Sequence, residues 1–111
     1  MKLTDVSKTA IATLRCHVVE SKKKRPVIND PMAGYCLNNL VALASDEDKT
    51  GIFKKKLSPV LTSHIAIRAR KFDNIVNDYV SKYPDCIVVN LGCGFDTRYW
   101  RLTSQSKTAS I

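Results

Sequence analysis

The sequence has no run of about eighteen apolar residues, the length that a membrane-spanning helix needs. Residues 1–15 also lack the apolar stretch and small-residue cleavage site of a secretory signal peptide. We therefore expect no membrane partner, no secretion and a cytoplasmic location. With 44% hydrophobic and 25% charged residues in 111, the composition is that of a globular chain that buries one modest core, in one domain or part of one.

The chain is also poor in the residues that form metal sites. It has no Cys-x-x-Cys pair and no zinc-finger spacing of cysteine and histidine, and the two histidines, His17 and His64, lie far apart in sequence. We expect no metal ion. Because no export signal accompanies the cysteines, we expect free thiols at Cys16, Cys36, Cys86 and Cys93.

Acidic residues are in the minority, with 10 Asp and Glu against 18 Lys and Arg and a net charge of +8. Such an excess allows binding to the phosphates of nucleic acid. However, the basic runs at residues 22–25 and 54–56 lack the interleaved aromatic residues of a base-stacking surface. We interpret them as solvated loop or helix ends, and a nucleic-acid partner is the less favoured alternative.

Apolar residues at helical spacing predict a helix over about residues 3–20, ended by the first basic run. A second helix is predicted to begin at Pro31, because Asp30 can cap its free amides and proline suits the first turn. The polar segment 45–51, which ends in glycine, is predicted to be a loop. The expected buried face of the second helix consists of Met32, Tyr35, Cys36, Leu40 and Leu43.

A third helix is predicted to begin at Pro59, after the capping residue Ser58, and to reach about Lys82. One stripe of this helix is mostly apolar and carries a single arginine as an anomaly. The stripe consists of Leu61, Ile65, Arg68, Phe72, Ile75, Val76 and Tyr79.

The segment 86–91 is a short apolar run rich in β-branched residues, which predicts a strand buried on both faces. The turn Gly92-Cys93-Gly94 follows directly. In a doubly wound sheet, the first strand-to-helix turn is the favoured place for a nucleotide. Glycine lets the main chain approach a ligand closely, although a purely structural turn also needs it.

Two phosphate-binding patterns are missing from this turn. Thr97 stands where the dinucleotide fingerprint has its third glycine, and no Gly-Lys-Ser or Gly-Lys-Thr ending of a P-loop is present. The pattern therefore favours neither NAD nor FAD nor a P-loop nucleotide. S-adenosylmethionine has no phosphates, so its site needs close backbone approach without a pyrophosphate cradle. The absence of both phosphate-binding patterns therefore favours a methyltransferase.

Arg68 gives a separate indication, because burying a guanidinium is costly without an anionic partner. One interpretation is a structural ion pair with a protein carboxylate such as Asp96 near the turn. The other is the carboxylate of the methionyl part of the cofactor, which arginine can hold with two hydrogen bonds. The periodicity leaves both open.

The turn lies in the string Asn90-Leu91-Gly92-Cys93-Gly94-Phe95-Asp96-Thr97-Arg98-Tyr99-Trp100-Arg101-Leu102. This string resembles the first-strand motif of the leucine carboxyl methyltransferase family, which includes O-methyltransferases of polyketide synthesis. The motif, Leu-Gly-small-Gly-x-Asp-Thr-Arg with Arg-Leu close behind, is far more specific than Gly-x-Gly. Three further pieces follow the family's order: Thr9-Ala10 ahead of Glu20, Asp30-Pro31 with Ala33, and Arg68-x-Arg70-x-Phe72-Asp73.

The resemblance implies an α/β fold of the class I methyltransferases, in which an N-terminal helical layer packs beside a seven-stranded, Rossmann-like sheet. This chain would hold the helical layer and the first strand, and so be mostly helical as it stands. The resemblance also implies S-adenosyl-L-methionine as methyl donor. Its cofactor-binding residues, carried over by position, are Arg68, Gly92, Cys93, Gly94 and Asp96.

Within that set, Arg68 looks like the arginine that grips the cofactor carboxylate, and the two glycines look like the turn under the methionyl and ribose parts. Asp96 is similar to the family's hallmark, together with Thr97 and Arg98, and we expect these three to shape the turn. Arg98 also has Asp73 or Asp78 as a candidate partner. No catalytic residue is predicted.

The sequence departs from the family at two positions and at its end. His17 stands where many members have an arginine, and Met32 replaces the aromatic residue that usually follows Asp-Pro; either change is expected to alter the lid over the site. Residues 103–111 contain no acidic residue that would hold the ribose hydroxyls after a second strand. We thus expect a helical lid (1–84), a strand and cofactor turn (85–102) and a divergent or disordered tail (103–111).

We expect this chain alone to bind the cofactor weakly or not at all and to be inactive, because the family's site draws on a longer sheet. The methyl acceptor is open between a protein C-terminal carboxylate and a small molecule with a carboxyl or hydroxyl group. One alternative is a non-enzymatic helical module derived from a methyltransferase, with Arg68 paired to a protein carboxylate. A second is the basic nucleic-acid binder.

Overall fold

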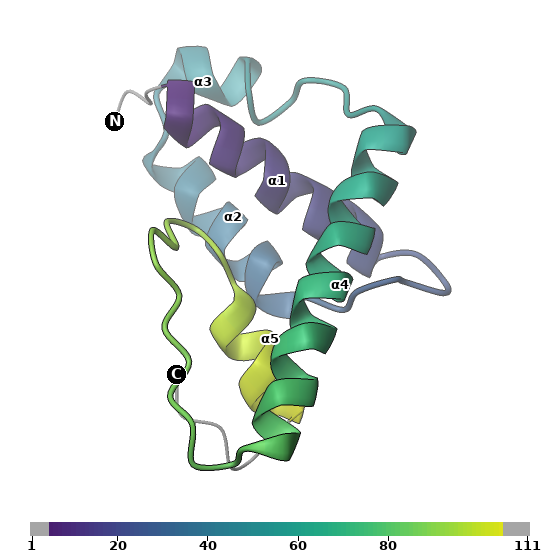
Figure 1. Ribbon diagram of the computed structural model, residues 1–111. Coiled ribbons are helices and arrows are strands. Elements are labelled where there is room, and N and C mark those ends of the chain that lie inside the picture. The colour runs from purple at the N-terminus through teal and green to yellow at the C-terminus, as the bar shows by residue number, and fades with distance from the viewer. Residues whose placement is uncertain (1–4, 106–111) are drawn as a thin grey trace.

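The computed structural model describes residues 5–105, and most of these residues lie in five α-helices (Figure 1). Helix α1 packs against both α2 and α4, and the last helix packs against α4. The segment that follows α4 runs back alongside the helical layer before it turns into the last helix (Figure 1). The helices are α1 (Asp5–Ser21), α2 (Pro31–Leu43), α3 (Asp46–Thr50), α4 (Pro59–Lys82) and α5 (Arg98–Gln105).

Both predicted cap-and-proline starts are confirmed. The Asp30 side chain accepts a hydrogen bond from the Ala33 amide at the start of α2, and the Ser58 side chain accepts one from the Leu61 amide at the start of α4. Each helix has proline in its first turn, where a missing amide proton costs no intrahelical bond.

The predicted loop at 45–51 is wrong, because a short helix, α3, covers most of it. The Ser45 side chain caps this helix by accepting a hydrogen bond from the Asp48 amide. Acidic residues fill its first turn, where the positive end of the helix dipole favours negative charge. The basic run at 22–25 is an exposed loop between α1 and α2, as predicted.

The core is small and lies where α1 meets α4. Its largest apolar members are Ile11 and Leu14 of α1 and Leu102 of α5, each at most 3% exposed. Helix α4 contributes mainly short side chains, which let α1 approach closely. The residues that α4 buries are Thr62, Ala66, Ala69, Asp73 and Val80.

The predicted apolar stripe of α4 exists but is not the buried face. Phe72, Ile75 and Tyr79 are about half exposed, at 50%, 51% and 57%. Helix α1 packs instead on the neighbouring face, where alanines permit close contact, so tertiary packing overrides the hydrophobic periodicity. The predicted buried face of α2 is partly wrong for the same kind of reason, since Tyr35 and Leu43 are 67% and 63% exposed.

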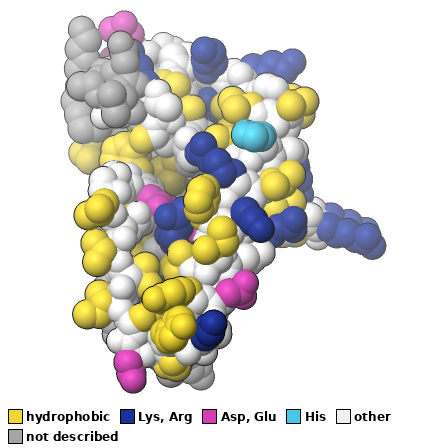
Figure 2. Space-filling model, viewed as in Figure 1, with side chains coloured by type: hydrophobic (Ala, Val, Ile, Leu, Met, Phe, Trp, Pro, Cys, Tyr) yellow, Lys and Arg dark blue, Asp and Glu magenta, His cyan; other side chains and the backbone are white. Residues whose placement is uncertain are grey.

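The predicted strand at 86–91 is not formed, and no strand occurs within the described residues 5–105. Ile87, Val89 and Leu91 are between 70% and 87% exposed. A strand requires a neighbouring strand to satisfy its backbone groups, and the described residues offer none. The described chain is helical, as expected, and the α/β sheet is implied only by the family discussed below. Figure 2 shows hydrophobic side chains exposed over α4 and along the segment that follows it.

At the end of the chain, Thr103–Gln105 continue helix α5 instead of belonging to a separate tail. The remainder of the predicted tail, 106–111, lies outside the described residues. None of the helices in the described part combines the length and apolar character needed to cross a bilayer. All four cysteines carry free thiols, and the described side chains form no metal-binding group of His, Cys, Asp and Glu.

Candidate functional site

A cavity of about 310 Å³ lies between α1, α4 and the segment that leads into α5. Helix α1 contributes Thr13 and His17 to its walls, and α4 contributes Ile65 and Phe72. The cavity also brings together all five residues that the sequence assigns to cofactor binding. These are Arg68, from the middle of α4, and Gly92, Cys93, Gly94 and Asp96, from the turn.

The glycine turn has a backbone that only glycine adopts easily. Gly92 and Gly94 have φ angles of 58° and 50°, in the left-handed region. A Cβ atom at either position would meet no atom within 4 Å, so the requirement comes from conformation and not from crowding. The turn therefore leaves open space over its main chain on the side of the cavity.

Asp96 holds the turn closed. Its Oδ2 accepts a hydrogen bond from Asn90 Nδ2 at 2.9 Å, and its Oδ1 accepts one from the Arg98 amide at 3.1 Å. The Asp96 amide donates to the Cys93 carbonyl at 2.8 Å. This geometry fits the predicted role of Asp96 in shaping the turn.

Arg68 is exposed at the edge of the cavity and forms no ion pair within the described residues. The ion pair between Arg68 and Asp96, given above as one of two open interpretations, is not made, because Asp96 instead faces Arg98, with Nη1 and Oδ2 3.5 Å apart. The premise that Arg68 is buried is also wrong, because its side chain is exposed and α1 packs on the neighbouring face of α4. Arg68 remains a cationic side chain with its donors available at the cavity.

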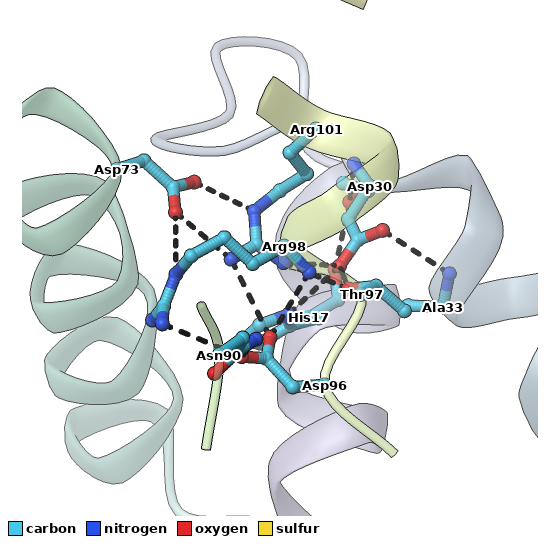
Figure 3. A network of polar contacts seen from close by, with 10 residues as sticks. His17, Asp30, Ala33, Asp73, Asn90, Asp96, Thr97, Arg98 and Arg101 are labelled. Atoms are coloured by element: carbon cyan, nitrogen blue, oxygen red, sulfur yellow. Dashed lines mark hydrogen bonds and ion pairs between the residues drawn. The ribbon is translucent and has the colours of Figure 1, made fainter. Parts of the chain in front are cut away.

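A buried polar network underlies the turn (Figure 3). Asp30, 1% exposed, accepts hydrogen bonds at Oδ2 from His17 Nδ1 at 2.8 Å and from Arg101 Nη1 at 3.1 Å. The same oxygen accepts a short hydrogen bond from the Thr97 hydroxyl. Its other oxygen, Oδ1, accepts the Ala33 amide at 3.2 Å. One carboxylate thus joins α1, α2 and α5.

Asp73 forms the second half of this network. Its Oδ2 accepts Arg101 Nε at 2.6 Å, and its Oδ1 accepts Arg101 Nη2 at 3.0 Å and Arg98 Nε at 3.2 Å. Of the two partners considered for Arg98, Asp73 is therefore the correct one. The two arginines of α5 tie that helix to α4.

The network shifts the acid–base behaviour of its members. Burial disfavours the charged carboxylate of Asp30, but hydrogen bonds from His17 and Thr97 and the charge of Arg101 outweigh it and lower the pKa of Asp30. Burial likewise disfavours the charge of Arg101, yet its hydrogen bonds and ion pairs with Asp73, Asp30 and Asp96 raise the pKa of its guanidinium. Both shifts favour the ionised forms of Asp30 and Arg101.

Sequence reasoning missed Arg101 as a member of this network, and with it the bonds that Asp73 and Asp30 make to Arg101. A signal for Arg101 was present, because it follows Thr97 by four residues and so shares a helix face with it. Asp30 was identified only as a helix cap, and its second oxygen gives no sequence signal. His17, noted as a departure from the family, is 6% exposed and lines the cavity, whereas Met32 does not.

Comparison with known proteins gives a consistent result. The family described as leucine carboxyl methyltransferase matches this chain over residues 9–111. The tetracenomycin polyketide synthesis O-methyltransferase TcmP of Streptomyces glaucescens is 29% identical over 102 residues, which are 92% of this chain and 35% of that protein. A "Putative S-adenosyl-L-methionine-dependent methyltransferase" of Mycobacterium marinum is 32% identical over 112 residues, covering 89% of this chain and 34% of the relative.

Leucine carboxyl methyltransferase 1 of Candida albicans is 32% identical over 69 residues, which are 61% of this chain and 18% of that protein. The chain thus spans about a third of the length of the first two relatives, and less of the third. No solved structure matches it.

Proposed function

Because the chain belongs to the leucine carboxyl methyltransferase family, we propose that it supplies the cofactor-binding part of an S-adenosylmethionine-dependent O-methyltransferase. One observation carries the proposal: an arginine without an ion pair in the described chain and a left-handed glycine turn, 24 residues on, line the same cavity. The two relatives that align with the largest share of this chain are both named as methyltransferases, which supports the proposal.

The residues present fit the amino-acid end of the cofactor. Arg68 offers a planar set of donors that suits a carboxylate, and no protein carboxylate competes for it among the described residues. The open main chain at Gly92 and Gly94 allows a ribose or methionyl group to approach closely. The sulfonium of S-adenosylmethionine, when bound, supplies the methyl group for transfer.

The size of the cavity fits part of the cofactor. Ligand pockets commonly measure about 300–1,000 Å³, and this cavity, at about 310 Å³, is at the lower end. We therefore assign it to the methionyl and ribose parts and expect weak binding by this chain. The proposed acceptor is an oxygen of a carboxyl or hydroxyl group, in keeping with one relative named as an O-methyltransferase and another named as a leucine carboxyl methyltransferase. We propose that this group belongs to a protein C-terminus or a small molecule.

Two observations favour this proposal over its alternatives. A helical module without a ligand would have Arg68 paired with a protein carboxylate, which is not found in the described residues. A nucleic-acid binder would use the basic runs at 22–25 and 54–56, which contain no aromatic residue for base stacking and contribute nothing to the cavity lining.

The proposal is tested by saturation-transfer NMR on the 111-residue chain with four ligands at millimolar concentration. We expect S-adenosylmethionine and S-adenosylhomocysteine to receive magnetisation from the protein, and NAD and ATP to receive little. Equal signals from ATP would contradict the proposal and favour a site for polyanions. Displacement of the S-adenosylmethionine signal by S-adenosylhomocysteine controls for nonspecific contact.

A further inference from the structure

Apart from the hydrogen bond between Asn90 and Asp96, the glycine turn receives little support from the segment before it. Ile87 and Leu91 are 78% and 87% exposed, and no strand holds them in place within the described chain. The residues after the turn are buried, since Thr97 and Arg101 are 1% and 6% exposed. The position of the turn is therefore set from its C-terminal side.

We propose that Asp30 is a positioning residue for this turn. Its Oδ2 holds Thr97, the third residue after Gly94, and also holds Arg101 one helical turn further along α5. Arg101 Nη1 in addition donates to the Thr97 hydroxyl at 2.7 Å, so the three side chains form a closed ring of hydrogen bonds. The consequence for cofactor binding rests on the proposed function.

Asp30 Oδ2 also accepts a hydrogen bond from a residue in the α1 wall of the cavity. His17 of α1 lines the cavity, and its Nδ1 donates to Asp30 Oδ2. Asp30 thus joins the α1 wall to the segment that carries the turn (Figure 3). Asp73 cannot replace this link, because it connects α5 only to α4. Without Asp30, α5 would keep its ion pairs with α4 and lose the polar link that this carboxylate makes to α1 and α2.

The two oxygens of Asp30 allow its two roles to be separated. Oδ1 caps α2 through the Ala33 amide, and Oδ2 makes the link to the turn. In Asp30→Ser, a hydroxyl retains the cap, because serine is a good N-cap residue, but the carboxylate of the network is lost. Thr97→Val is a second, milder variant that removes only the hydroxyl of the ring.

A matched control is Ser45→Ala. This substitution removes the N-cap of α3, a helix that contributes no residue to the cavity. It therefore perturbs a cap of similar kind away from the turn. Circular dichroism of all three variants checks that the helices remain folded, and Thr97→Val decides the question if Asp30→Ser does not fold.

Two readouts test the proposal. Trp100 is the single tryptophan and lies on α5 between Thr97 and Arg101, so acrylamide quenching of its fluorescence reports how firmly α5 is held. We expect quenching to increase in Asp30→Ser and Thr97→Val and to stay unchanged in Ser45→Ala. We also expect the affinity for S-adenosylmethionine to fall about tenfold in Asp30→Ser, the effect of one lost charge-assisted hydrogen bond, and to be unchanged in Ser45→Ala.

Unchanged quenching in both network variants would overturn the proposal. So would increased quenching with an unchanged affinity for the cofactor, because Asp30 would then hold α5 without positioning the turn. If the wild-type chain binds no S-adenosylmethionine, the proposed function fails, and the quenching of Trp100 still decides whether Asp30 holds the helix that carries the turn.

Discussion

Arg101 meets Asp73 with two of its nitrogens, Nε at 2.6 Å from Oδ2 and Nη2 at 3.0 Å from Oδ1. Arg101 is almost fully buried, so this two-point contact is shielded from water. The contact joins the helix after the glycine turn to the helix that carries Arg68. The ion pair between Arg101 and Asp73 therefore links the glycine turn to the helix that carries Arg68, although neither residue of the pair lies in the turn.

Substitution of Asp73 should destabilise the fold strongly. Asp73→Ala leaves Arg101 buried with part of its charge uncompensated, and breaking a buried pair in this way costs about 3–5 kcal/mol. Asp78→Ala is the control, because Asp78 is exposed on the same helix and a surface change costs within about 0.5 kcal/mol. Urea unfolding measures both free energies, and similar values for the two variants would contradict the assigned pair.

The contribution of Asp30 to stability should depend on pH. Its pKa is lower in the folded chain than in the unfolded chain, so the ionised carboxylate stabilises the fold above the unfolded value, about 3.9 for aspartate. This stabilisation is lost as the pH falls through the lower, folded pKa. The difference in unfolding free energy between wild type and Asp30→Asn should therefore shrink as the pH falls from about 5 toward about 2.

Glu20 also has a lowered pKa in the folded chain, but it does not disturb this comparison. Hydrogen bonds from Lys23 and from the Val27 amide lower its pKa too, against the opposing effect of burial, but Glu20 is unchanged in both proteins and its effect cancels in the difference. A difference that stays constant down to about pH 2 would show that Asp30 is not held as a carboxylate.

Alanine in place of glycine should have opposite effects at two kinds of position. At Gly92 or Gly94, the left-handed backbone costs an L-residue about 1–2 kcal/mol, although space for a methyl group is present. At Gly34, inside α2 and with open space around it, alanine should stabilise the helix by about 0.5–1 kcal/mol. Thermal unfolding of the single variants measures the signs, and stabilisation by Gly94→Ala would exclude the assigned turn.

Arg68→Ala should weaken binding of ligands that carry the methionyl carboxylate and spare those that lack it. We expect about a tenfold or greater loss of affinity for S-adenosylhomocysteine, since a hydrogen bond to a charged group contributes about 1.5–3 kcal/mol, and little change for 5′-methylthioadenosine. Arg70→Ala is the matched control, an exposed arginine of α4 that does not line the cavity. Equal losses in both variants would indicate general electrostatic attraction.

The sequence predicts the starts of α2 and α4 well because their caps are local. Asp30 and Ser58 each precede a proline and accept the amide three residues on, and no distant residue is needed for this signal. Strand 86–91 was predicted from its composition and is not formed, because a strand depends on partners elsewhere in the chain.

The candidate site divides in the same way. The glycine turn and Arg68 were identified from motif and periodicity, and the structure places them at one cavity. The argument that Arg68 is buried was wrong, because packing of α1 selects which face of α4 is covered. The bond between Asp30 and Arg101 spans 71 residues and has no local pattern, so only the structure reveals it.

The most direct test of the proposed cofactor cavity is a two-dimensional ¹⁵N NMR titration of the 111-residue chain with S-adenosylhomocysteine. We expect the largest shifts at the amides of Gly92, Cys93 and Gly94 and at the side-chain Nε of Arg68, with no comparable change at residues 54–56. Shifts confined to the basic runs, or none at the turn with ligand in millimolar excess, would contradict the assignment of the cofactor to this cavity.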